Sequence, residues 1–177
     1  MSLSTPIANR RRFLIQAAIV TVALWLPMEW FKAHYRIGIA TQSSTCLPGW
    51  RVFLMDLDDR TPQRDTVYAF RTRGIAVTLP GGLTLFRDGT EIAKIVAGLP
   101  GDTVEVGRDV TRVNGVVEGE GLDLARTLKK QPEDFVRRDT VPAGHFLFMG
   151  RTRDSYDGRY WGYVGADQLV GRAYHLY

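Results

Sequence analysis

The sequence predicts a mainly β domain that follows one N-terminal transmembrane helix and carries a short helical insertion. An uncharged apolar run occupies residues 13–28 and directly follows an arginine cluster. Beyond it, short alternating or apolar segments are separated by glycine, proline and aspartate, which is the pattern of β-strands and turns. Only residues 122–130 have a helical pattern. With 177 residues, 45% of them hydrophobic and 24% charged, the chain has room for one globular domain and a short appendage.

The N-terminal apolar run predicts an uncleaved membrane anchor. The run is shorter than the about 20 residues of a complete membrane-spanning helix, but Trp25, Trp30 and Phe31 can extend it into the membrane interface. No Ala-x-Ala cleavage site follows, because the run ends in proline, methionine and glutamate. This ending favours an anchor over a removed signal peptide. A buried core helix is the remaining alternative.

The charges beside the anchor predict its orientation. Arg10, Arg11 and Arg12 place the N-terminus in the cytoplasm, because positively charged flanks stay on that side of the membrane. We therefore expect a cytoplasmic segment over residues 1–12, a transmembrane anchor over 13–31 and a domain over 33–177 on the opposite side. In a bacterium this describes a single-pass protein of the inner membrane with its domain in the periplasm. Membrane lipid is then an expected partner.

The domain is expected to consist of short strands joined by tight turns. Asn114-Gly115 is typical of a two-residue hairpin turn. A polar insertion over about residues 119–138 contains the expected helix, over residues 122–130. The expected strands cover residues 35–40, 52–55, 66–70, 75–79, 92–97, 104–106, 110–113, 116–117, 146–149 and 169–174.

Charge and cysteine content exclude several classes of function. The net charge of +4 comes from 23 basic and 19 acidic residues that are scattered together, so the basic stripe of a nucleic-acid-binding protein is missing. The single cysteine, Cys46, excludes an internal disulfide framework and a CxxC metal site. Asp56, Asp58 and Asp59 lack the glycine and the final glutamate of a calcium loop, so we expect a solvated loop there and no metal site.

Lys94 is an unusual residue for its position. It lies among Ala93, Ile95 and Val96, so this segment is expected to be a buried strand. The glycines and proline of residues 98–101 then predict a rigid turn. Enzymes use buried lysines as proton acceptors, because burial disfavours the ammonium form. The alternative is a lysine whose stem packs in the core while its head reaches solvent.

Three separated segments, read together, resemble type I signal peptidases. Residues 92–102 (IAKIVAGLPGD) look like the lysine box of that family, residues 141–162 like its C-terminal box and residues 169–173 like its closing strand, in the family's order. The resemblance implies a membrane-docked β fold and a serine and lysine dyad that cleaves after small residues. It also implies a precursor protein with a leader peptide as substrate, and no cofactor.

The resemblance places the nucleophile shortly before a proline at the start of the domain. In the family's branch that matures conjugative pilins, the nucleophile lies two residues before that proline, which is Cys46 in Cys46-Leu47-Pro48. The chain departs from the family by offering a thiol in place of a hydroxyl. Sulfur is the stronger nucleophile, and the turn that follows would hold it in place. Ser44 is the alternative nucleophile, and the longer spacing of ordinary signal peptidases would select Thr45.

The resemblance also suggests residues that support the reaction. Ser44 could bind the oxyanion together with the backbone N–H of Cys46. Ser155 resembles the serine that hydrogen-bonds the catalytic lysine, and Asp157 resembles an aspartate that supports the site, although Asp157 could equally form an ion pair with Arg159. A competing Cys-His arrangement would need His145, whose ring nothing in the sequence orients.

Two functions from different classes follow. The leading hypothesis is a membrane-anchored endopeptidase that removes leader peptides, with pilin precursors of a conjugation or type IV secretion system as substrates. The second is a catalytically silent β module that binds the same precursors or assembly proteins, because the usual serine is missing. Lys94 discriminates between them, since a binding module has no reason to bury a lysine.

Overall fold

The structure is a computed structural model that describes residues 6–40, 46–79, 82 and 84–177. The chain divides into two compact units, residues 1–36 and residues 37–177. In the first unit, α1 (Pro6–His34) is a single helix of 29 residues that continues through Pro27. Residues 10–34 of this helix are long and apolar enough to cross a membrane, by length and composition. The predicted apolar helix is therefore present, and it extends beyond the predicted run at both ends.

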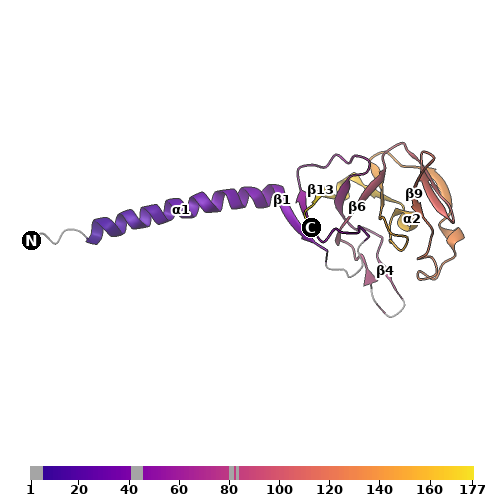
Figure 1. The fold of residues 1–177 in the computed structure, drawn as a ribbon, viewed down its shortest axis with the longest axis horizontal. Helices are drawn as coiled ribbons and strands as arrows, with labels where there is room; N and C mark the ends of the chain where they lie inside the picture. The colour runs from indigo at the N-terminus through magenta and orange to yellow at the C-terminus, as the bar shows by residue number, and fades with distance from the viewer. Residues whose placement is uncertain (1–5, 41–45, 80–81, 83) are drawn as a thin grey trace, which may run out of the picture. The chain divides into compact units, whose positions relative to one another are not determined.

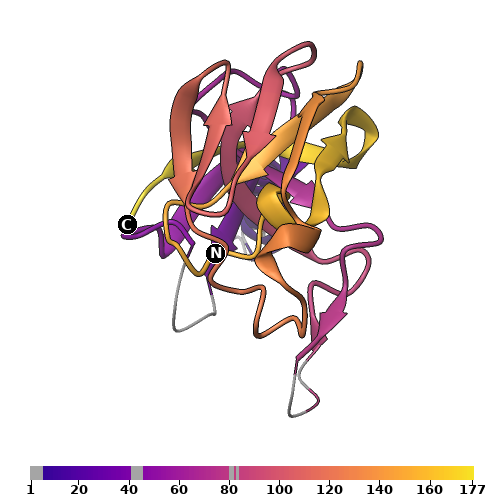
Figure 2. The same ribbon diagram turned by 90° about the vertical axis from the view of Figure 1, so that its right-hand side faces the viewer.

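The second unit is built from antiparallel sheets, which confirms the mainly β fold class. One sheet has seven strands in the order β1-β2-β13-β3-β6-β11-β12, a second has four in the order β10-β7-β8-β9, and β4 and β5 form a two-stranded hairpin. Figure 1 shows β6 and β13 close together, and Figures 1 and 2 both show the β4 hairpin projecting from the body of this unit. The strands are β1 (Tyr35–Ile39), β2 (Val52–Asp56), β3 (Val67–Arg71), β4 (Val77–Thr78), β5 (Thr84–Leu85), β6 (Glu91–Gly98), β7 (Thr103–Val106), β8 (Val110–Val113), β9 (Val116–Glu120), β10 (Arg137–Thr140), β11 (His145–Met149), β12 (Tyr163–Gly165) and β13 (Leu169–His175).

Strand β6 carries Lys94 through the middle of the larger sheet. It pairs with β3 on one side, where Lys94 lies opposite Tyr68, and with β11 on the other, where Val96 lies opposite Phe148. Tyr68, Val96 and Phe148 are completely buried. An apolar strand between two others satisfies its backbone hydrogen bonds and packs side chains on both faces, which fixes the position of the lysine.

The turn that follows β6 is held by one carboxylate, that of Asp102. Its oxygens accept hydrogen bonds from the Leu99 backbone N–H (2.5 Å), from Arg64 (2.7 Å) and from Asn114 (2.6 Å). Burial raises the pKa of Asp102, but these hydrogen bonds and the charge of Arg64 outweigh it and lower the pKa below 3.8. Gly101 completes the turn at φ +91°, a conformation that favours glycine. The predicted rigid turn is confirmed.

Local structure agrees with the predictions at most strands and differs at the insertion. Asn114 and Gly115 have positive φ angles of 50° and 82°, as a two-residue hairpin turn requires, and they join β8 to β9. The helix predicted over residues 122–130 is wrong, because this stretch forms consecutive turns. Leu122 and Ala125 anchor these turns in the core beside β7 and β8. The helical part of the insertion is the 3₁₀ turn η1 (Pro132–Asp134).

Other elements were not predicted. The strand expected over residues 75–79 is reduced to β4, and it pairs with β5, which the sequence pattern did not indicate. Strands β10 and β12 and the short elements α2 (Gly158–Trp161) and η2 (Ala166–Gln168) were also missed. Among these, α2 matters for function, because its first turn carries the buried Arg159.

Candidate active site

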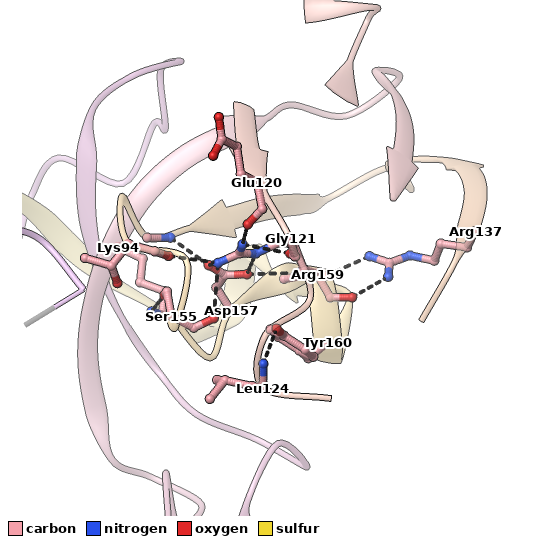
Figure 3. Close-up of polar contacts among 12 residues, drawn as sticks. Lys94, Glu120, Gly121, Leu124, Arg137, Ser155, Asp157, Arg159 and Tyr160 are labelled. Atoms are coloured by element: carbon pink, nitrogen blue, oxygen red, sulfur yellow. Dashed lines mark hydrogen bonds and ion pairs between the residues drawn. The ribbon is translucent and has the colours of Figure 1, made fainter. Parts of the chain in front are cut away.

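Lys94 is fully buried and its amine has a defined partner. The side chain is 1% exposed, and Nζ donates a hydrogen bond to the Ser155 hydroxyl at 2.9 Å. Ser155 is itself completely buried. Figure 3 shows the lysine on its strand pointing toward Ser155. The alternative in which the lysine head reaches solvent does not fit this structure, and the expected contact between Ser155 and Lys94 is present.

Cys46 is half-buried and lies close to Ser155. Its carbonyl oxygen accepts a hydrogen bond from the Arg151 backbone N–H at 2.8 Å, which ties it to the segment after β11. Gly150 separates the two side chains. A Cβ atom added to Gly150 would lie 2.2 Å from Ser155 Oγ and 2.9 Å from Cys46 Cβ. Because glycine has no side chain, the side chains of Cys46 and Ser155 can both pack closely against residue 150.

Cys46 and Lys94 line the same cavity, which has a volume of about 210 Å³. Its walls are mostly apolar and come from the end of β1, from residues 46–53 and from the start of β6. The other lining residues are Ile39, Ala40, Leu47, Trp50, Phe53, Phe86, Thr90, Glu91, Ile92 and Ala93. This cavity is therefore bordered by both residues that the sequence predicts as nucleophile and base.

Asp157 and Arg159 form a buried ion pair beneath Ser155. Both side chains are at most 1% exposed, and two contacts of 2.9 Å join the guanidinium to the carboxylate. Asp157 Oδ2 also accepts a hydrogen bond from the Gly150 backbone N–H at 3.0 Å. Burial lowers the pKa of Arg159, but the hydrogen bonds and charge of Asp157 outweigh it and raise the pKa above its ordinary value. The ion pair between Asp157 and Arg159, which was one of the two roles predicted for Asp157, is present.

Arg159 also donates hydrogen bonds to four backbone carbonyl groups. Two of them, from Glu120 at 2.6 Å and Gly121 at 3.2 Å, belong to the start of the insertion. The other two, from Thr152 at 3.1 Å and Ser155 at 3.2 Å, belong to the loop that carries Ser155. Figure 3 shows Arg159 at the centre of these contacts. A single guanidinium thus joins the insertion to the loop that positions the partner of Lys94.

The remaining predicted residues have different outcomes. Ser44, the predicted oxyanion donor and alternative nucleophile, lies outside the described residues, as does Thr45. His145 does not line the cavity that Cys46 and Lys94 share, and its Nδ1 lies 3.0 Å from the Ala143 carbonyl oxygen. Sequence reasoning did not identify the carbonyl contacts of Arg159 or the spacer position of Gly150. The Asp-x-Arg spacing at the start of α2 was the available signal, since Asp157 caps that helix by accepting from the Arg159 N–H.

Comparison with known proteins identifies the family. The family model described as signal peptidase, peptidase S26, matches residues 10–177. The chain therefore belongs to the peptidase S26 family of signal peptidases, which are peptide hydrolases. Its mainly β unit and N-terminal apolar helix accord with the fold expected from the three sequence boxes.

Individual relatives carry the same name. A signal peptidase I from Leptolyngbya laminosa is 39% identical over 82 residues, which cover 45% of this chain and 37% of that protein. A signal peptidase IB from Staphylococcus aureus is 25% identical over 177 aligned residues, which cover 90% of this chain and 85% of the relative. A crystal structure of a signal peptidase I from Enterococcus faecalis V583 is 27% identical, covers 65% of this chain and 98% of the other, and has a TM-score of 0.40.

Proposed function

We propose that this chain is a membrane-anchored endopeptidase that removes leader peptides from exported precursor proteins, with Cys46 as nucleophile and Lys94 as general base. The observation that carries the proposal is the buried Lys94, whose amine is hydrogen-bonded to Ser155 and which lines the same cavity as Cys46. Among the described residues no carboxylate lies within ion-pair distance of this amine, so the lysine is not committed to a structural salt bridge.

The proposed reaction has two steps. As Cys46 Sγ attacks the carbonyl carbon before the cleaved bond, its proton passes to Lys94 Nζ, and the C–N bond then breaks as the departing amine takes that proton. Water next attacks the thioester, Lys94 accepts one of its protons, and that proton returns to the sulfur as the C–S bond breaks. Ser44 and the backbone N–H of Cys46 are the proposed donors to the negatively charged oxygen in both steps.

The proposed orientation of the substrate follows from the size of the cavity. The resemblance implies small side chains before the cleaved bond, and a cavity of about 210 Å³ has room for small side chains. We therefore place the end of the leader peptide in this cavity. The protein is proposed to cross the bacterial inner membrane once, with residues 1–12 in the cytoplasm, residues 13–31 in the membrane and residues 33–177 in the periplasm.

The finer identity of the substrate rests on one local feature. Cys46-Leu47-Pro48 has the nucleophile-to-proline spacing of the branch that matures conjugative pilins. Pilin precursors of a conjugation or type IV secretion system are therefore the proposed substrates. Mass spectrometry of the processed pilin would show the new N-terminus and would also separate a hydrolysed chain from a cyclic one, which is lighter by one water.

Replacement of Lys94 by methionine tests the enzyme against a silent binding module. The substitution keeps most of the side-chain volume and removes the base, so processing of the precursor in cells should fall about 100- to 10,000-fold. Lys130→Met, at an exposed lysine, is the matched control and should process normally. If Lys94→Met processes the precursor at the rate of the unaltered chain, Lys94 is not the base and the binding module is favoured.

A further inference from the structure

A second cavity adjoins Cys46. It has a volume of about 650 Å³, about three times that of the cavity shared with Lys94, and Cys46, Phe86 and Thr90 line both. Its other apolar lining comes from three separate parts of the chain: the β4–β5 hairpin, the insertion and the loop after β11. These apolar residues are Leu79, Leu85, Leu124, Leu128 and Tyr156.

Aromatic rings hold these three parts together. The rings of Phe86 and Tyr156 stack with centroids 5.7 Å apart and planes inclined by 3°, and Tyr156 contacts Tyr160 at 5.8 Å. The Tyr160 hydroxyl accepts a hydrogen bond from the Leu124 N–H at 3.0 Å, which fixes the insertion against them. Phe86 has φ +49°, an uncommon conformation for a bulky residue that persists only where the surroundings impose it. The cavity is thus supported from several sides.

The proposed reaction places the leader peptide in the smaller cavity, which lies on one side of Cys46. A peptide whose carbonyl carbon lies at Sγ must continue beyond the cleaved bond, and the larger cavity begins at the same cysteine. Its lining differs from that of the smaller cavity, because it adds leucines and a tyrosine together with the exposed charges of Arg87 and Asp154. Its volume accommodates an aromatic side chain, and apolar walls favour binding one.

The geometry points to the larger cavity as the binding site for the substrate segment that follows the cleaved bond, with selection for a bulky apolar or aromatic residue there. This inference rests on the proposed function, since it needs the leader side in the smaller cavity. The chain would then select its substrate on both sides of the cleaved bond, with small side chains before the bond and a large apolar side chain after it.

Three synthetic precursor peptides test this inference with the full chain in detergent micelles. One carries phenylalanine at the two positions after the cleaved bond, one carries alanine there, and one carries phenylalanine at the two positions before the bond. A bulky apolar residue in a matching cavity is worth about 10-fold or more in kcat/KM. We expect the first peptide to be cleaved about 10-fold better than the second, and the third to be cleaved worst.

Two variants of one hairpin locate the selection in the cavity. Leu85 lines the cavity and Val77, its partner across the hairpin, does not. Leu85→Ala should reduce the preference for phenylalanine over alanine about 5-fold, because part of the apolar wall is lost. Val77→Ala, which truncates the same hairpin, should keep the preference of the unaltered chain. Leu79→Ala provides a second cavity variant if Leu85→Ala does not accumulate.

Each outcome bears on a different claim. Cleavage of the first two peptides at equal rates overturns the larger cavity as a selective site and leaves the proposed function standing. A preference for phenylalanine before the bond overturns the assigned direction of the substrate. Equal loss of preference in Leu85→Ala and Val77→Ala places the selection outside the cavity. Failure of the unaltered chain to cleave any of the peptides, with the natural precursor also uncut, overturns the proposed function itself.

Discussion

The two halves of the candidate site are held in different ways. The lysine half lies in the core: Lys94, Ser155, Asp157 and Arg159 are at most 1% exposed and are linked by hydrogen bonds. The cysteine half lies at the surface of the same unit, where Cys46 is half-buried and its carbonyl oxygen accepts a hydrogen bond from the Arg151 backbone N–H. The proposed base, Lys94, is therefore preorganised by the fold, whereas the proposed nucleophile, Cys46, lies outside the helices and strands of the described residues.

This difference predicts that substitutions in the two halves affect stability and activity to different extents. A change in the lysine half removes a partner from a buried polar network, so it should cost stability as well as activity. A change in the cysteine half should alter activity with little effect on stability. The predictions below challenge this contrast, beginning with the largest expected effect.

Arg159→Met should give the largest loss of stability. It leaves Asp157 as a buried charge without its partner, which costs about 3–5 kcal/mol, and it releases four carbonyl groups of the insertion and the Ser155 loop. Thermal unfolding of the full chain in detergent should show a large drop in melting temperature. Arg153→Met is the matched control, since Arg153 is exposed and its ion pairs contribute little. Similar melting temperatures for the two variants would contradict the buried role of Arg159.

Ser155→Ala should lower activity through the position of the lysine. It removes the acceptor of the Lys94 amine and leaves a buried polar group unsatisfied, at a cost of about 1–3 kcal/mol. We expect kcat for precursor cleavage to fall while KM changes little, because Ser155 is hydrogen-bonded to the proposed base and does not line the cavity proposed to bind the leader peptide. Ser155→Thr, which keeps the hydroxyl, should recover part of kcat. A variant that changes KM alone would assign Ser155 to substrate binding.

Gly150→Ala tests the contact between the two halves. The added methyl group would collide with Ser155 and with the Cβ atom of Cys46, so the two side chains must move apart. Overpacking of this kind costs about 1–3 kcal/mol in stability. We expect cleavage to fall further than this loss of stability alone would cause, as measured by kcat at a temperature well below the melting transition. Full activity in Gly150→Ala would show that the spacing of Cys46 and Ser155 is not important.

Asp102→Asn should give a smaller and pH-dependent loss. The pKa of Asp102 is lower in the folded chain than its ordinary value of 3.8, so its contribution to stability is present above that pH and is lost as the pH falls through the folded-state pKa. The variant should therefore melt below the unaltered chain at pH 7, and the two melting temperatures should converge as the pH falls below the folded-state pKa of Asp102. Asp109→Asn, at an exposed aspartate, should show no such convergence. A gap that stays constant with pH would mean that the Asp102 charge does not stabilise the turn.

The sequence predicted the individual strands better than the contacts between them. The apolar neighbours of Lys94 indicated a buried strand, and Asn114-Gly115 indicated the turn between β8 and β9, because both signals depend on adjacent residues. Strand β10 was missed since its residues, Arg137 to Thr140, lack an apolar alternation and form a strand at the sheet edge by pairing with β7. Residues 122–130 have helically spaced leucines, but they form consecutive turns from which Leu122 and Ala125 pack into the core.

In the candidate active site, too, contacts between residues distant in the sequence could not be predicted from the residue pattern alone. The pairing of Lys94 with Ser155 joins residues 61 positions apart, and only a resemblance to a family with that arrangement could predict it. The four carbonyl contacts of Arg159 depend on backbone groups, which carry no sequence signal. The close packing of Gly150 between Cys46 and Ser155 is likewise a property of the folded chain.

The nucleophile is the central claim, and one comparison of rates tests it most directly. The full chain and its variants Cys46→Ala and Ser44→Ala are each given the same synthetic precursor peptide, and cleavage is followed by mass spectrometry. With Cys46 as nucleophile, Cys46→Ala has no measurable activity, whereas Ser44→Ala is slowed about 10- to 1000-fold by the loss of an oxyanion donor. An active Cys46→Ala together with an inactive Ser44→Ala would contradict the account and assign the attack to Ser44.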